Sequence, residues 1–202
     1  MNISLEKIKR LREETSAGIL DCKQALEETG GDLERAKRAL REKGTKIAEK
    51  KVGKKTTQGA IVAYIHHNGR VGTMAEIHCQ SDFVARNAEF QKFARDIAMH
   101  TTAFNPRWIS PQDIPESVIE EEKSIIKVQA EREGRSQKII EKIVEGRIKA
   151  FYKEVCLLEQ PFFKEEKMTV KDYLQQFIAK VGENVKIHRF VRYELREESR
   201  DN

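Results

Sequence analysis

Residues 79–87 read CQSDFVARN, and the hydrophobic pattern of the chain changes there. Residues 71–79 before it have the pattern of a strand, whereas residues 85–100 carry apolar side chains at helical spacing. Asp82 is therefore the expected N-cap, because its carboxylate would lie near unpaired backbone N–H groups. Phe83 would follow at the first helical position, where its ring can either project from the junction or pack into the core.

Two further stretches predict strands beside this one. Residues 60–66 form an apolar run, and His67-Asn68-Gly69-Arg70 separates it from the run at 71–79. Asn-Gly between two apolar runs is a strong hairpin signal. Residues 184–195 alternate at their start and predict a third strand. Helices are expected over residues 83–101, 117–133, 137–156 and 169–181, with a proline-rich interruption at 104–115 and a turn at Gly134 that makes an antiparallel helical hairpin.

The first 44 residues predict a small helical bundle. Helices are expected from Ser4 to about residue 15, from 19 to 29, and from the cap Asp32 to Gly44. Such a bundle resembles a ubiquitin-associated domain, a module that binds partners through the loop between its first two helices. In this chain that loop includes Ile19 and Leu20, which could equally be core residues.

These patterns together predict an α+β protein. We expect a helical, ubiquitin-associated-like domain at residues 1–52 and a basic linker at 53–58. A core domain at 59–195 would hold a three-stranded antiparallel sheet packed by helices and a helical hairpin, and residues 196–202 would form a charged tail.

Charge is unevenly placed along the 202 residues. The formal net charge is +5, and residues 1–55, with 15 Lys/Arg against 10 Asp/Glu, account for it. The lysine-rich run Lys46–Lys55 could attract phosphates or an acidic protein surface, or simply keep a linker helix solvated. No apolar run approaches the ~18 residues of a membrane helix and no secretory segment is evident, so we expect a cytoplasmic protein without a membrane partner.

The sequence contains no recognisable catalytic site. Cys22, Cys79 and Cys156 are odd in number and far apart, which favours buried reduced thiols over disulfides or a metal site. Glycine-rich nucleotide loops and the His-Glu-x-x-His zinc motif are missing. His66 and the adjacent His67 would point to opposite faces. We therefore expect no enzyme activity, no cofactor and no metal ligands.

The four residues Ser81-Asp82-Phe83-Val84 resemble the Thr-Asp-Phe-Val motif of the bacterial elongation factor Ts family, the nucleotide exchange factors of elongation factor Tu. Four other segments match that family in the same order along the chain. They are IKRLREETSAGILDCKQAL at residues 8–26, DIAMH at 96–100, VEGR at 144–147 and QPF at 160–162.

The resemblance implies a function and a set of contact residues. The chain would bind the GDP complex of elongation factor Tu and promote exchange of GDP for GTP, with Ser81, Asp82, Phe83 and Val84 displacing magnesium and opening the nucleotide site. Arg12, Ile19 and Leu20 match the family's contact region for the partner's nucleotide domain. His66, in Tyr64-Ile65-His66, matches a turn histidine placed near the same partner surface, although a solvated histidine would explain it as well.

Two departures from the family pattern bear on this reading. Ser81 stands where threonine is usual, which removes one methyl group and keeps the hydroxyl. The chain also has one hairpin-plus-helix unit, whereas long family members duplicate it. Short members are expected to dimerise, so the resemblance implies a homodimer formed through the final strand or the core helices.

A competing hypothesis is an RNA- or ribosome-associated module that uses the lysine-rich linker, since attraction to phosphates needs no sequence code. No aromatic residues are interleaved in the basic run, and no Gly-x-x-Gly clamp is present, so direct sequence-specific nucleic-acid binding is not expected. A ubiquitin-associated adaptor would leave three-quarters of the chain unexplained.

Overall fold

The structure is a computed structural model that describes residues 3–15 and 17–195. The charged tail predicted for residues 196–202 lies outside the described residues. Contacts group the chain into two units. Among the described residues, unit 1 takes 3–15, 17–62, 75–96 and 172–188, and unit 2 takes 63–74, 97–171 and 189–195.

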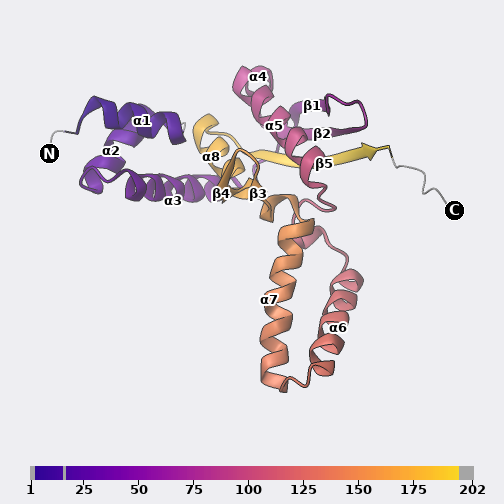
Figure 1. Cartoon of the computed structure of the whole chain (residues 1–202). Helices are drawn as coiled ribbons and strands as arrows, with labels where there is room; N and C mark the ends of the chain where they lie inside the picture. Colours follow the sequence, from indigo (N-terminus) through magenta and orange to yellow (C-terminus); the bar gives the residue numbers. More distant parts are fainter. Residues whose placement is uncertain (1–2, 16, 196–202) are drawn as a thin grey trace. The chain divides into compact units, whose positions relative to one another are not determined.

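Unit 1 begins with the three predicted helices, α1 (Leu5–Thr15), α2 (Ile19–Glu28) and α3 (Leu33–Lys51) (Figure 1). Their spacing of apolar residues turns one stripe of each helix inward. The stripes meet in a common core of Ile8, Leu11, Cys22, Ala25, Leu26 and Ala36. Burial of these side chains is the main stabilising term of the bundle.

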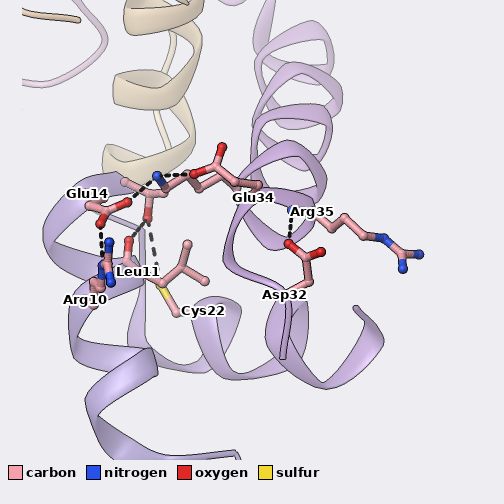
Figure 2. A network of polar contacts seen from close by, with 9 residues as sticks. Arg10, Leu11, Glu14, Cys22, Asp32, Glu34 and Arg35 are labelled. Atoms are coloured by element: carbon pink, nitrogen blue, oxygen red, sulfur yellow. Dashed lines mark hydrogen bonds and ion pairs between the residues drawn. The ribbon is translucent and has the colours of Figure 1, made fainter. Parts of the chain in front are cut away.

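Polar contacts tie the helices of this bundle together at its surface (Figure 2). Lys37 of α3 contacts Glu14 of α1, and Glu14 also accepts a 2.9 Å hydrogen bond from Arg10. These two cations lower the pKa of the Glu14 carboxyl below its ordinary value. At the start of α3, the Asp32 side chain accepts a 3.0 Å hydrogen bond from the backbone N–H of Arg35, so the predicted cap is confirmed.

The predicted end of the third helix at Gly44 is wrong, because α3 continues to Lys51. Gly44 is buried inside the helix, and a Cβ placed there would lie 3.8 Å from Ala179 Cβ of α8 (Val170–Val181). Next to it, Thr45 Oγ1 donates a 2.9 Å hydrogen bond to Gln175 Oε1. At that distance a methyl group would make only an ordinary contact, so Gly44 lies against α8 without ending the helix. The first part of the lysine-rich run belongs to α3.

The predicted three-stranded antiparallel sheet is confirmed. Its strands are β1 (Gln58–Ile65), β2 (Val71–Cys79) and β5 (Val185–Glu194), in the order β1-β2-β5. At the hairpin turn, His66 N–H donates to the carbonyl of Val71 at 2.9 Å, and Gly69 has a φ of +66°. That backbone conformation strongly favours glycine and explains the Asn-Gly signal.

The helix predicted over residues 83–101 is two helices, α4 (Asp82–Arg86) and α5 (Ala88–Phe104). Asn87 interrupts them with an extended ψ of 135°, and its side chain accepts a 2.8 Å hydrogen bond from Glu89 N–H. An asparagine that bonds to nearby backbone in this way competes with a continuous helix. In unit 1, Phe93 of α5 stacks on Phe177 of α8 with 4.5 Å between ring centroids.

Unit 2 contains the predicted helical hairpin, α6 (Glu116–Arg132) and α7 (Gln137–Val155), which lie side by side in Figure 1. Gly134 joins them at a φ of +72°, as the sequence predicts. Ile126, Ala130, Ile140 and Ile148 are buried on these helices.

A second, two-stranded sheet in unit 2 was not predicted. It pairs β3 (Pro161–Phe162) with β4 (Glu165–Thr169). A short 3₁₀ helix, η2 (Leu157–Glu159), precedes β3 in the chain, and a second 3₁₀ helix, η1, spans Pro111–Asp113. Gln160 before β3 is buried, and its side chain bonds to His100 Nε2 at 3.0 Å and to the Glu154 carbonyl at 2.6 Å. The segment at residues 160–162 is thus part of the unit 2 core.

Candidate partner-binding site

The motif at residues 81–84 lies where β2 gives way to α4. Ser81 is the N-cap, with an extended backbone (φ −119°, ψ 154°), and its Oγ accepts a 3.3 Å hydrogen bond from Val84 N–H. The prediction that Asp82 caps the helix is therefore wrong. Asp82 occupies the first helical position, since the serine hydroxyl just before it already reaches the N–H that a cap must satisfy.

Glu183, on the connection between α8 and β5, holds this junction in place. Its Oε2 accepts hydrogen bonds from the backbone N–H groups of Gln80 and Ser81, at 3.2 and 3.0 Å. Its Oε1 accepts a 2.7 Å bond from the Ser81 hydroxyl. Hydrogen bonds to a carboxylate are strong. The three that Glu183 accepts therefore fix the direction in which the motif leaves the sheet.

Cys79 closes the same junction from the side of the sheet. Its thiol donates to the carbonyl of Ser81 at 3.2 Å. Burial raises the pKa of the Cys79 thiol to about 11, and the nearby Glu183 carboxylate adds to the rise. A thiol in this state is an inert structural group rather than a nucleophile.

Phe83 projects from the second position of α4 instead of packing inward. Its side chain is 83% exposed, whereas Ala85 two residues later is buried. A large apolar residue on the surface is common by itself. Here, however, the backbone next to the exposed ring is held in place, because Glu183 binds the N–H groups of residues 80 and 81 and the Ser81 side chain binds that of residue 84. An aromatic side chain on a fixed backbone is suited to insertion into a partner.

Asp82 presents a partly solvated carboxylate beside that ring. Its side chain is 47% exposed and pairs at 3.5 Å with the exposed guanidinium of Arg86, one turn later in α4. Such surface pairs are weak, so Asp82 can exchange Arg86 for another positive partner at little cost. Val84 is half-buried and its backbone is tied to Ser81.

The remaining predicted contact residues lie elsewhere. Arg12 is exposed on α1, and Ile19 and Leu20, at the start of α2, are 55% and 81% exposed. Of the two alternatives for Ile19 and Leu20, the structure thus favours surface over core. His66, in unit 2, is half-buried and its Nδ1 lies 3.2 Å from the Tyr64 hydroxyl.

The comparisons with known proteins decide the family. The family model described as "Elongation factor TS" matches residues 6–197. A curated elongation factor Ts of Carboxydothermus hydrogenoformans is 52% identical over 195 residues, covering 96% of this chain and 90% of that protein. The chain belongs to the elongation factor Ts family. The elongation factor Ts of Fervidobacterium nodosum is 47% identical over 197 residues, 98% of this chain and all of the other protein. That of Thermoanaerobacter sp. (strain X514) is 50% identical over 192 residues, 95% and 94% of the two chains.

Family membership confirms the resemblance on which the sequence reading depended. The chain is a translation elongation factor of the elongation factor Ts type, a nucleotide exchange factor for elongation factor Tu. Among the described residues, no helix is both long enough and apolar enough to cross a membrane. Glu183 is the residue that the sequence reading missed, because its link to Ser81 spans 102 residues and leaves no local pattern.

Proposed function

We propose that the chain binds the GDP complex of elongation factor Tu and speeds GDP release by inserting Phe83 into the partner while Asp82 disturbs the magnesium site. The observation that carries this proposal is the 83% exposure of Phe83 beside the anchored Ser81. No covalent bond is made or broken, so the protein acts as an exchange factor and not as an enzyme. We place this activity in the cytoplasm.

The ring of Phe83 supplies the opening force. Burial of a phenylalanine side chain contributes on the order of 1.5–3 kcal/mol. Because the cap and Glu183 already hold the backbone of α4, little conformational freedom is lost when the ring enters a gap in the partner. More of the burial energy is then available to separate the partner's packed elements.

The negative charge of the Asp82 carboxylate acts on the magnesium ion of the partner. A GTPase holds GDP partly through Mg²⁺, which bridges phosphate oxygens and protein ligands. A carboxylate brought close to that ion competes with its ligands or its water shell, and loss of the ion weakens the hold on the β-phosphate. The weak pairing of Asp82 with Arg86 leaves it available for this contact.

Exchange also requires a difference in affinity between two states of the partner. The protein can shift the partner towards release only by binding the nucleotide-free state more tightly than the GDP-bound state. Insertion of Phe83 provides this difference, since the gap that admits the ring is open only in the distorted partner.

A second contact region would hold the partner without distorting it. We place Arg12, Ile19 and Leu20 against the nucleotide domain of elongation factor Tu, and His66 on the same partner. The exposure of Ile19 and Leu20 at the start of α2 supports this role. Linking two contact regions in one chain raises the effective concentration of each at its site.

We further propose a homodimer that uses the final strand. In unit 2, Val191 and Tyr193 of β5 are 43% and 73% exposed, and Ile65 and Met74 of the hairpin are 70% and 49% exposed. Exposed apolar side chains on neighbouring strands are typical of a surface that another chain covers. Light scattering of the full chain and of a Tyr193→Asp variant tests this, and a parent that is monomeric at micromolar concentration contradicts it.

The decisive experiment measures release of fluorescent GDP from elongation factor Tu across a magnesium titration. The parent should accelerate release strongly, and the folded double variant Asp82→Ala/Phe83→Ala should accelerate it little. Val52→Ala serves as a matched control, since Val52 is 74% exposed and outside the motif. Equal acceleration by parent and double variant would move the activity to other contacts. No acceleration by the parent would overturn the exchange mechanism and make RNA binding the next test.

A further inference from the structure

Glu76, His78 and His188 bring metal-ligand side chains together in unit 1. Glu76 and His78 are two residues apart on β2, so they share the face opposite to the buried residues Ala75 and Ile77. His188 comes from β5, the neighbouring strand of the sheet. One ligand atom from each of the three residues lies within 4.8 Å of the others.

The contacts within this cluster are close and specific. The imidazole rings of His78 and His188 stack with 4.5 Å between centroids and 16° between their planes. His78 Nε2–H donates a 2.6 Å hydrogen bond to Glu76 Oε1. Glu76 and His78 are half-buried and His188 is exposed, so the ligand atoms are held partly by the sheet and remain open to solvent.

We propose that Glu76, His78 and His188 form a binding site for a divalent transition-metal ion of the Zn²⁺ type. Two imidazoles and one carboxylate are a ligand set that Zn²⁺ uses in proteins, at bond lengths of about 2.0–2.2 Å. To bind one ion, the His78 and His188 rings would have to rotate out of their stacked arrangement, so that the in-plane lone pairs of their nitrogens point to the same position. Imidazole nitrogens favour Zn²⁺, Ni²⁺ or Cu²⁺ over Mg²⁺ and Ca²⁺, which prefer oxygen ligands. Three protein ligands leave at least one position for water.

The bound ion would link β2 and β5, the two strands that lie next to Ser81 and Glu183 in the chain. His78 is followed on β2 by Cys79 and, two residues further, by Ser81, while Glu183 precedes the first residue of β5. An ion shared by β2 and β5 therefore stabilises the native arrangement of these strands. Because a preformed site is absent from the unfolded chain, binding raises the melting temperature.

Zinc titration of the chelator-treated full chain by calorimetry tests the site. The parent should bind a single equivalent saturably and melt at a higher temperature with Zn²⁺ than without it. His188→Ala should weaken binding by at least about tenfold, because loss of a residue that only orients a metal ligand already costs about that much and His188 is itself a proposed ligand. The double variant His78→Asn/His188→Ala should bind no Zn²⁺ at the same site. Acidification should weaken binding in the parent, since protons compete with the metal for imidazole nitrogens.

Two controls keep the result specific. His67→Ala removes an exposed histidine of the hairpin turn and should leave binding unchanged. The metal-free melting temperatures of the variants show that each still folds, and Co²⁺ absorption spectra report directly whether histidine nitrogens bind the ion. Failure of the parent to bind Zn²⁺ saturably at millimolar concentration overturns the proposal. So does retention of the parent's affinity by the double variant, because the ion would then be held by other groups.

Discussion

The hydroxyl of Ser81 donates a 2.7 Å hydrogen bond to Glu183 Oε1, although 102 residues separate the two in the chain. The same carboxylate accepts both backbone N–H groups at positions 80 and 81. Glu183 thus orients the start of α4, and through it the direction of Phe83, without contacting the ring in any bond described.

Removal of this carboxylate should damage both the fold and the exchange activity. Glu183→Ala leaves partly buried N–H groups without their acceptor, and loss of hydrogen bonds to a charged group lowers the free energy of unfolding by about 1–3 kcal/mol. Urea denaturation measures the stability change, and GDP release from elongation factor Tu measures the change in exchange rate.

Glu145→Ala is the matched control for Glu183, since Glu145 is exposed and pairs only with Lys149 in the contacts described. It should change the free energy of unfolding by no more than about 0.5 kcal/mol and leave exchange intact. An exchange rate in Glu183→Ala equal to the parent's, measured where the variant is folded, would show that Glu183 does not position the motif.

Gly44→Ala should make the protein more stable. Gly44 lies inside α3, and the nearest atoms to an added Cβ are Ala179 Cβ at 3.8 Å and Gln176 Cα at 4.0 Å, which are ordinary contacts. Glycine inside a helix is less favourable than alanine by about 0.5–1 kcal/mol, so the free energy of unfolding should rise by that amount. Thermal melts report it. A lower melting temperature would mean that α3 cannot approach α8 closely with a methyl group at this position.

The sequence predicted the elements whose signals are local. Asn68-Gly69 marks the hairpin, Asp32 caps α3, and Gly134 joins α6 to α7, because each of these residues acts on backbone within a few positions of itself. The junction between strand and helix was also located correctly, since the change from a strand pattern to a helical pattern at residues 79–87 is a local feature.

Long-range contacts account for what the sequence did not predict. Gly44 looked like a helix end, because nothing nearby in the chain indicates that α8 packs against it. Asp82 was the expected cap, but Ser81 takes that position, with its hydroxyl oxygen accepting from Val84 N–H while the hydroxyl donates to Glu183. The β3–β4 pair was missed since β3 has only two residues, too short for an alternating pattern.

The three cysteines should resist alkylation in the native protein. Cys22, Cys79 and Cys156 are buried, and burial raises the pKa of each thiol, to about 11 for Cys79 and Cys156. At pH 8 only about a thousandth of such a thiol is the reactive thiolate. Mass spectrometry after brief iodoacetamide treatment should find unmodified native protein and three modified cysteines after denaturation. Rapid labelling of the native chain would contradict the burial of these thiols.

Acid should destabilise the protein through His100. This histidine is fully buried in unit 2, stacks on Phe104 with 4.5 Å between centroids, and bonds to Gln160. Burial lowers the pKa of His100 from 6.5 to about 4. Between these values the unfolded chain binds a proton at this histidine that the folded chain does not bind. The contribution of His100 to the free energy of unfolding is therefore fully present above pH 6.5 and is lost as the pH falls towards 4. The difference in pKa corresponds to about 3 kcal/mol.

His100→Gln isolates this contribution, because glutamine carries no proton that titrates in this range. The free energy of unfolding of the parent, measured with urea at intervals from pH 7 to pH 4, should fall more steeply than that of the variant, while the carboxylates shared by both proteins cancel in the comparison. The gap between the two curves should change by up to about 3 kcal/mol across this range. Parallel curves would mean that His100 is protonated equally in the folded and unfolded states, in contradiction to its burial between Phe104 and Gln160.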